Sequence, residues 1–445
     1  MLEQYVCDVR DTLDHRARNV AASPEDGLDT TRPSVDSSIM LKFQHGAVIT
    51  LIIPALLSAQ TTMSAPPEAL ALTHVTVIDG TGAEPQRDKT VIIVGDRIQA
   101  ISNGSAGIPT RARIIPANGQ FLIPGLWDMH VHLVESDLPL LVAYGVTGVR
   151  DMGNILENVD VWRGKIAAGA MVGPRIARVG PILNGKEFGP VHVAIENAAE
   201  ARAAVRVLKK NGVDEIKLHR ALSRDAYFAL ADEAKKLSIP FVGHVPQTVT
   251  AAEASDAGQA SIEHTESMFD GERPVKPEET QALFERFVKN KTSYDPTLTA
   301  YRGSTDSANV DPQLLKKYPD LISGRKQLFT QFLQLVGMMN RTGVTLLTGT
   351  DLGQKWIRPG STLHDELELF VQAGLTPMQA IQASTRNAAR FLHVEYGTID
   401  VGKTASLVLL DANPLDDIRN TRKIRAVILE GKFFDRSQLD SLLRR

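Results

Sequence analysis

Cysteine is almost missing from this 445-residue chain, which contains Cys7 and no other. One thiol cannot form an intramolecular disulfide, and it cannot supply the several sulfur ligands of a thiolate metal site. Any metal centre in this protein must therefore use nitrogen and oxygen ligands.

A strong charge of either sign is also missing. The 49 Lys and Arg residues nearly balance the 52 Asp and Glu residues, for a formal net charge of −3. This balance gives no electrostatic reason to expect nucleic acid or an anionic membrane as a partner. The apolar run at residues 47–57 is too short for a stable membrane anchor. What the chain does have is length and 43% hydrophobic residues, enough for a large core with a second, small domain.

The N-terminal region does not resemble a folded segment. Residues 1–39 are polar and show no sustained hydrophobic period, so we predict a disordered tract or an over-long start. Residues 40–59 then combine a positive charge, a short apolar run and small residues, as secretory signal peptides do. A buried hairpin or helix is the alternative. The signal-peptide interpretation predicts that translation starts at Met40, that the mature chain starts near Gln60, and that the protein is exported, periplasmic or secreted.

The most informative motif is a predicted strand that ends in two histidines. Residues 121–132 read Phe-Leu-Ile-Pro-Gly-Leu-Trp-Asp-Met-His-Val-His. Because side chains alternate along a strand, His130 and His132 would point to one face and could bind one metal ion. An isolated His-x-His is equally well explained as a surface or core accident.

Four further candidate ligands each follow a short apolar run of their own. They are Lys217 in Asp-Glu-Ile-Lys-Leu-His, His244 in Ile-Pro-Phe-Val-Gly-His, His264 in Ala-Ser-Ile-Glu-His, and Asp351 in Val-Thr-Leu-Leu-Thr-Gly-Thr-Asp. Single alternatives exist: a salt bridge for Lys217, a core histidine for His264 and a helix cap for Asp351. Chance explains one such strand end easily and five poorly.

The intervals between these strand ends predict an α/β fold. Each is long enough for a helix and the next parallel strand, and the alternation continues over residues 121–395. Functional side chains at the carboxyl ends of many strands favour a (β/α)8 TIM-like barrel over a doubly wound sheet, whose ligands gather at one switch point. Residues 60–120 and 396–445 contain alternating strands with glycine turns, so we predict that both chain ends form one small β-sandwich.

Taken together, these motifs resemble a known family. Pro-Gly-Leu-Trp-Asp-Met-His-Val-His, Gly-Val-Thr-Gly-Val-Arg-Asp, Ile-Lys, Gly-His, Ile-Glu-His and Gly-Thr-Asp occur in the order typical of the amidohydrolase superfamily of metal-dependent hydrolases. The resemblance extends over residues 70–435 and is strongest to the imidazolonepropionase-like group, which includes Xaa-Pro dipeptidase-type enzymes. It implies one divalent metal on His130, His132 and Asp351, a second on His244 and His264, and a carboxylated Lys217 bridging the two.

The resemblance further implies a binuclear amidohydrolase of amide or peptide carbon–nitrogen bonds, of dipeptidase, carboxypeptidase or N-acyl amide hydrolase type. Two divalent ions, expected to be Zn²⁺, would carry a bridging hydroxide. Asp351 and His264 are the candidate catalytic residues, with Asp351 passing the water proton to the leaving nitrogen. Two alternatives stay open: a mononuclear deaminase or cyclic-amide hydrolase of the imidazolonepropionase type, with Lys217 unmodified, and a non-catalytic barrel homologue.

The expected substrate is a small-molecule amide or dipeptide, and the sequence does not choose among candidates. Four side chains on predicted strand ends or loops are candidate substrate-binding residues: His219, His192, Arg150 and Tyr294. Arg150 could instead pair with Asp151, and Tyr294 could pack in a strand. The sequence also leaves a homo-oligomer open.

Overall fold

The structure, a computed structural model, describes residues 69–444 apart from 187–188, 266–268, 271–272 and 275–276. The predicted tract 1–39 and the predicted signal peptide 40–59 lie outside the described residues. Among the described residues, no helix combines the length and apolar character needed to cross a membrane.

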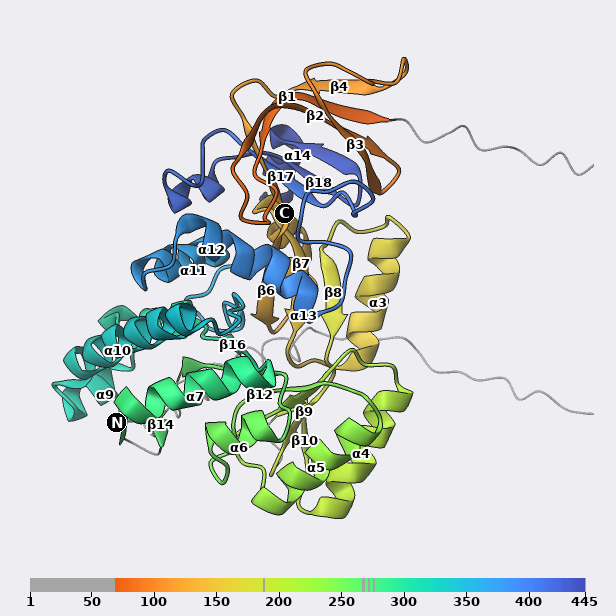
Figure 1. Cartoon of the computed structure of the whole chain (residues 1–445). Coiled ribbons are helices and arrows are strands. Elements are labelled where there is room, and N and C mark those ends of the chain that lie inside the picture. The colour runs from red at the N-terminus through yellow and green to blue at the C-terminus, as the bar shows by residue number, and fades with distance from the viewer. Residues whose placement is uncertain (1–68, 187–188, 266–268, 271–272, 275–276, 445) are drawn as a thin grey trace, which may run out of the picture.

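An eight-stranded sheet is built from both ends of the described chain (Figure 1). Its strands are β1 (Leu70–Val77), β2 (Gln86–Val94), β3 (Arg97–Asn103), β4 (Arg113–Pro116), β5 (Phe121–Pro124), β17 (Leu407–Leu410), β18 (Ile424–Leu429) and β19 (Lys432–Asp435). They follow the order β19-β18-β17-β5-β1-β2-β3, with β4 paired to β1. Because β17 is antiparallel to both β5 and β18, it joins the two sets of strands. The two predicted sandwich halves are thus one continuous sheet with a shared apolar core that includes Val75, Val91, Leu407 and Ile428.

The strand predicted over residues 121–132 is divided. Pro124 and Gly125 separate β5 from β6 (Leu126–Val131), and the Gly125 amide donates to the Ser406 carbonyl at 2.8 Å. Proline has no amide to continue a ladder, so a break here is expected from its chemistry. Residues 121–124 consequently belong to the eight-stranded sheet, although the sequence assigned them to the barrel.

The central part of the chain consists of parallel strands, as an α/β fold requires. One sheet contains β6, β7 (Val146–Asp151) and β8 (Arg175–Arg178), and the other contains β9 (Ile182–Asn184), β10 (His192–Ala194), β11 (Ile216–Leu218), β12 (Phe241–Gly243), β13 (Ser261–Glu263) and β16 (Ser293–Asp295). A separate two-stranded sheet pairs β14 (Phe269–Asp270) with β15 (Arg273–Pro274). Residues 344–352 include the apolar run 344–348 that precedes Asp351, and they make isolated parallel bridges from Leu346 to Tyr294 and from Leu352 to Val131.

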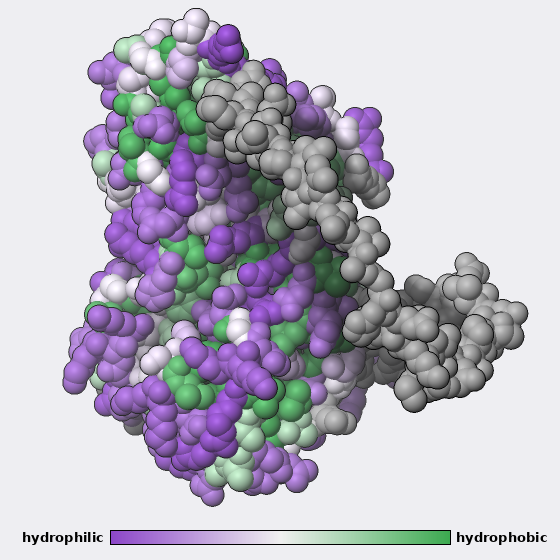
Figure 2. All heavy atoms as spheres, turned by 90° about the vertical axis from the view of Figure 1, so that its right-hand side faces the viewer, coloured by the Kyte–Doolittle hydropathy of each residue, from purple (hydrophilic) through white to green (hydrophobic). Residues whose placement is uncertain are grey.

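Helices surround these parallel strands, and a last helix, α14, packs against β18 and β19 of the eight-stranded sheet (Figure 1). The helices of the described chain are α2 (Asp137–Ala143), α3 (Leu156–Ala167), α4 (Ala198–Lys210), α5 (Arg224–Lys236), α6 (Ala251–Asp256), α7 (Pro277–Asn290), α8 (Leu298–Ser304), α9 (Pro312–Lys317), α10 (Leu321–Thr342), α11 (Ser361–Gln372), α12 (Pro377–Gln382), α13 (Ala388–Phe391) and α14 (Arg436–Leu442), with short helical turns η2 (Ser307–Asn309), η3 (Ala383–Asn387) and η4 (Ile418–Arg422). Helix α4 shows why they form: Asn197 caps its first amides, and Ala201, Val205 and Leu208 make one buried face. Figure 2 shows hydrophilic side chains over much of the described surface, with smaller hydrophobic patches between them.

Candidate metal centre

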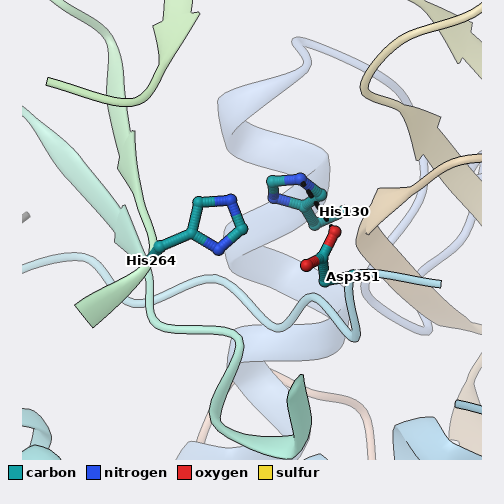
Figure 3. Close-up of side chains that lie close together, drawn as sticks. All are labelled: His130, His264 and Asp351. Atoms are coloured by element: carbon teal, nitrogen blue, oxygen red, sulfur yellow. Dashed lines mark ion pairs between the residues drawn. The ribbon is translucent and has the colours of Figure 1, made fainter. Parts of the chain in front are cut away.

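The predicted ligands meet at the carboxyl ends of the parallel strands. His130 lies at the end of β6, and His264 and Asp351 follow β13 and the 344–348 segment. Ligand atoms of these three buried residues all lie within 4.8 Å of one another, and their side chains point toward a common point (Figure 3). Asp351 Oδ1 is 3.6 Å from His130 Nε2 and 3.5 Å from His132 Nε2. The first predicted ligand set is therefore assembled.

The residues predicted for a second ion continue from this group. The ring centroids of His264 and His244 are 4.4 Å apart, and those of His264 and His130 are 4.6 Å apart. Lys217 Nζ is 3.3 Å from His130 Nε2. His264 Nδ1 lies 2.9 Å from the Thr297 hydroxyl, so its Nε2 is the nitrogen left for a ligand. All six predicted ligands thus belong to one contiguous cluster.

Two of these ligands have an unusual backbone. His264 has φ 69° and Asp351 has φ 59°, in the left-handed region that costs a non-glycine residue energy. Backbone hydrogen bonds hold both in place: the His264 amide donates to the Asp295 carbonyl at 2.9 Å, and the Asp351 amide donates to the His130 carbonyl at 2.8 Å. Residues held in such conformations cluster at functional sites, which fits the role predicted for them.

Glycines make room for the ligands in two motifs. At Gly349 a Cβ would lie 2.4 Å from His130 Cβ and 2.4 Å from Asp295 Oδ2. At Gly243, with φ 121°, a Cβ would lie 2.4 Å from the Leu218 carbonyl oxygen and 2.9 Å from Lys217 Cδ. The Gly-Thr-Asp and Gly-His motifs therefore need glycine because a side chain would displace a ligand or its strand.

Burial sets the protonation of the cluster. It lowers the pKa of His130 and of His244 well below the usual value, which leaves neutral rings with a lone pair to donate. Burial also lowers the pKa of Lys217 to about 8, so its free amine is more accessible than in solution. Burial alone would raise the pKa of Asp351, but the His132 hydrogen bond and the neighbouring histidines hold it well below its usual range. Neutral histidines and an ionised carboxylate are the donor set that a divalent metal ion requires.

Arg150 and Tyr294 are not where a substrate-binding role would need them. Arg150 is fully buried and donates to the Met129 carbonyl at 2.6 Å and to Glu263 Oε1 at 2.9 Å. Tyr294 is fully buried, and its hydroxyl donates to the His264 carbonyl at 2.8 Å. Both side chains lie in the interior between the parallel strands, where their polar atoms bond to residues next to the ligands. This position does not support the prediction that they bind substrate.

His219 and His192 lie on the other side of the cluster. The His219 ring centroid is 4.4 Å from that of His244 and 5.5 Å from that of His192. Both side chains are partly exposed. They therefore extend the line of imidazoles from the predicted second ion toward solvent, and they remain the candidates for substrate contact.

A buried carboxyl group that the sequence interpretation passed over is Asp128. It accepts hydrogen bonds from the Thr350 amide at 3.0 Å and the Thr350 hydroxyl at 2.7 Å. Burial raises the pKa of Asp128 to about 7 despite these bonds. The two hydrogen bonds from Thr350 to Asp128 connect the turn that contains Asp351 to the strand that contains His130. The place of Asp128 two residues before His130, on the same strand face, was the available signal.

This chain is similar to several known proteins. The amidohydrolase family matches residues 121–434. Ochratoxinase from Aspergillus niger is 25% identical over 427 residues, covering 79% of this chain and 83% of the relative. The structure of a putative prolidase from Bifidobacterium longum aligns with a TM-score of 0.72 and 26% identity over 85% of this chain and 99% of that one. A Xaa-Pro dipeptidase with bound methionine aligns with a TM-score of 0.68 and 22% identity over 83% and 100% of the chains.

Proposed function

This chain belongs to the amidohydrolase family and is a metal-dependent hydrolase of amide or peptide carbon–nitrogen bonds, and we propose that it uses two divalent metal ions. The observation that carries the proposal is the cluster of His130, His264 and Asp351, whose ligand atoms lie within 4.8 Å of one another. Neutral imidazoles and a carboxylate in a buried position suit Zn²⁺.

We assign the ligands as the sequence predicts. His130, His132 and Asp351 would hold one ion, His244 and His264 would hold the other, and a carboxylated Lys217 would be a ligand shared by both. Support for the carboxylation is the burial of Lys217, its pKa of about 8, and its contact with His130. A lysine in this environment readily presents the free amine that must react with carbon dioxide.

When bound, the metal ions polarise the substrate carbonyl and make a water molecule acidic enough to attack it near neutral pH. Asp351 would then accept the proton of the attacking water, since its carboxylate is ionised and faces His130 in β6 and His132 directly after it. The same carboxyl group donates this proton to the departing nitrogen, so the amine leaves neutral.

The parallel strands support this site as a (β/α)8 barrel, the closure of which we infer from backbone hydrogen bonds. The Tyr294 amide donates to the Thr345 carbonyl, and the Met129 amide donates to the Thr348 carbonyl. Residues 344–352 thus connect β16 to β6. A closed barrel would place all six ligands at one mouth.

The proposed substrate is a small amide or dipeptide whose end away from the metal ions contacts His219 and His192. The relatives support this class, because they include an ochratoxinase, a putative prolidase and a Xaa-Pro dipeptidase. A panel of N-acyl amino acids and Xaa-Pro dipeptides, assayed with metal-loaded protein, tests the class directly.

Metal stoichiometry is the test of the mechanism. We expect close to two divalent ions per chain by elemental analysis, and a mass increase at Lys217 that corresponds to one carboxyl group. One tightly bound ion with an unmodified lysine would favour the mononuclear alternative and overturn the binuclear proposal.

A further inference from the structure

A buried group of charges lies beneath the metal ligands and takes no part in the proposed hydrolysis. It consists of Arg150, Glu215, Glu263 and Asp295, whose side chains are 0 to 4% exposed. One guanidinium therefore faces three carboxyl groups in the interior of the parallel strands. Burial of a charge at this depth is expensive, so a group of this kind needs a reason to be retained.

The guanidinium of Arg150 connects several strands at once. Its Nε donates to the Met129 carbonyl at 2.6 Å, next to the ligand His130. Its Nη1 donates to Ser261 Oγ at 3.0 Å and lies 3.4 Å from Glu215 Oε2. Since Glu215 immediately precedes β11, which carries Lys217, these contacts link the strands of three predicted ligands: His130, Lys217 and His264.

The orientation of the guanidinium is fixed from two further sides. Its Cζ lies 5.2 Å from the centre of the Phe391 ring, at cation–π distance. Asp295 Oδ2 lies 3.8 Å from Nη2. The planar fork of arginine can serve all of these partners together, which the single ammonium of a lysine cannot do.

Glu263 connects Arg150 to the metal ligand His130. Its Oε1 accepts from Arg150 Nη2 at 2.9 Å and from the Ser261 hydroxyl, while its Oε2 lies 3.1 Å from His130 Nδ1. A carboxylate can only accept, so His130 Nδ1 must carry the proton. In a neutral ring this leaves the lone pair on His130 Nε2, the nitrogen that faces Lys217 and Asp351. The contact with Glu263 thus selects the form of His130 that binds a metal ion through Nε2.

We propose that Arg150 is a positioning residue of the metal centre: it holds Glu263, and through Glu263 it holds His130 with Nε2 turned toward the metal. Its contacts with Met129, Ser261 and Glu215 keep the ligand-bearing strands in register. The inference rests on the proposed function, because it assigns Arg150 to the metal site proposed there.

The same contacts explain a second group of acidic and histidine side chains. His130, Glu263 and Asp295 also offer ligand atoms within 4.8 Å of one another. The guanidinium of Arg150 already supplies a cation to both carboxyl groups of this group. This second group of side chains therefore supports the metal centre and is not a further metal site.

Zinc affinity of the full chain tests the proposal. The variants are Arg150→Lys, which keeps the charge but loses the fork, and Glu263→Gln, which keeps the shape but loses the charge. Arg325→Lys is the matched control, because Arg325 is 4% exposed on α10 and donates to the Ser304 carbonyl at 3.3 Å, outside the centre. Zinc dissociation constants come from competition with a chromophoric chelator, and the absorption spectrum of Co²⁺-loaded protein reports the ligand geometry.

We expect Arg150→Lys and Glu263→Gln each to weaken zinc binding by about 10- to 100-fold and to alter the Co²⁺ spectrum, as losses of support behind a metal-binding histidine do. Arg325→Lys should change neither. If Arg150→Lys does not fold, the double variant Arg150→Met/Glu263→Gln, which removes both charges together, should fold without metal and show the same weakened binding. Zinc affinity and spectrum equal to those of the unchanged protein, in any folded variant of Arg150 or Glu263, would overturn the proposal. Failure of the unchanged protein to bind zinc would instead overturn the proposed function.

Discussion

Replacement of Asp351 by asparagine separates metal binding from proton transfer at the centre. At φ 59° most side chains would add backbone strain, but asparagine tolerates the left-handed region at least as well as aspartate. The variant also keeps an amide oxygen close to His130 and His132. Asp351→Asn therefore removes the negative charge and the proton acceptor without moving the chain.

The size of the effect follows from the role assigned to the carboxylate. A positioned acid–base group contributes about 10² to 10⁴ in rate, which corresponds to about 2.7 to 5.4 kcal/mol of transition-state stabilisation. Four histidines and Lys217 remain in the cluster, so metal content should stay close to that of the unchanged protein. We expect the loss in kcat, with the free energy of unfolding nearly unchanged.

The assay is steady-state turnover of a cleaved substrate from the panel, with metal content measured on the same samples. Asp137→Asn is the control, since Asp137 is also a buried carboxyl group, 3% exposed, at the start of α2 and outside the proposed ligand set. Turnover of Asp351→Asn within about tenfold of the unchanged protein, at equal metal content, would refute the assignment of Asp351 as the proton acceptor.

Three further predictions address other parts of the molecule. Reconstitution with zinc in buffer freed of carbon dioxide should lower metal occupancy, and Lys217→Ala should remove this dependence; equal occupancy with and without carbon dioxide would argue against a carboxylated lysine. Burial lowers the pKa of His364 to about 4 from 6.5, so the folded state binds fewer protons than the unfolded state between these values and loses stability as the pH falls through them. In urea titrations across that range, His364→Gln should reduce the slope of the unfolding free energy by about 1.4 kcal/mol per pH unit, and an unchanged slope would contradict the reasoning. Exported protein should have an N-terminus within a few residues of Ala59 by mass spectrometry, whereas residues 1–39 found intact on it would contradict the predicted signal peptide.

The sequence was sufficient to predict the ligand cluster because each ligand follows its own apolar run. In parallel strands a run of this kind ends at the common carboxyl edge, so His130, His264 and Asp351 could be brought together without knowing any distance. Their left-handed conformations were not predictable from the pattern, because only the surrounding hydrogen bonds impose them.

The role of Arg150 could not be predicted from the same pattern. An arginine at a strand end is ordinarily expected near solvent, and the alternation of residues does not report which partners a long side chain reaches. Its burial depends on Glu215, Glu263 and Asp295, which come from three other segments of the chain. Pro124 and Gly125, in contrast, are a signal for a strand break that the sequence does contain. The apolar residues on both sides of them nevertheless suggested one continuous strand.

The pairing of β5 with β17 also sets the order of events while the chain is being synthesised. Gln120 and Asp411, at the ends of these two strands, are hydrogen-bonded across 291 residues of sequence. At about 5 to 20 residues per second, a ribosome needs roughly 15 to 60 s to deliver β17 after β5 has emerged. During that interval one edge of β5 has no neighbour and is open to pairing with other chains. Completion of the eight-stranded sheet must therefore be a late step of folding, and the nascent chain depends for its solubility on protection of that edge until its last strands arrive.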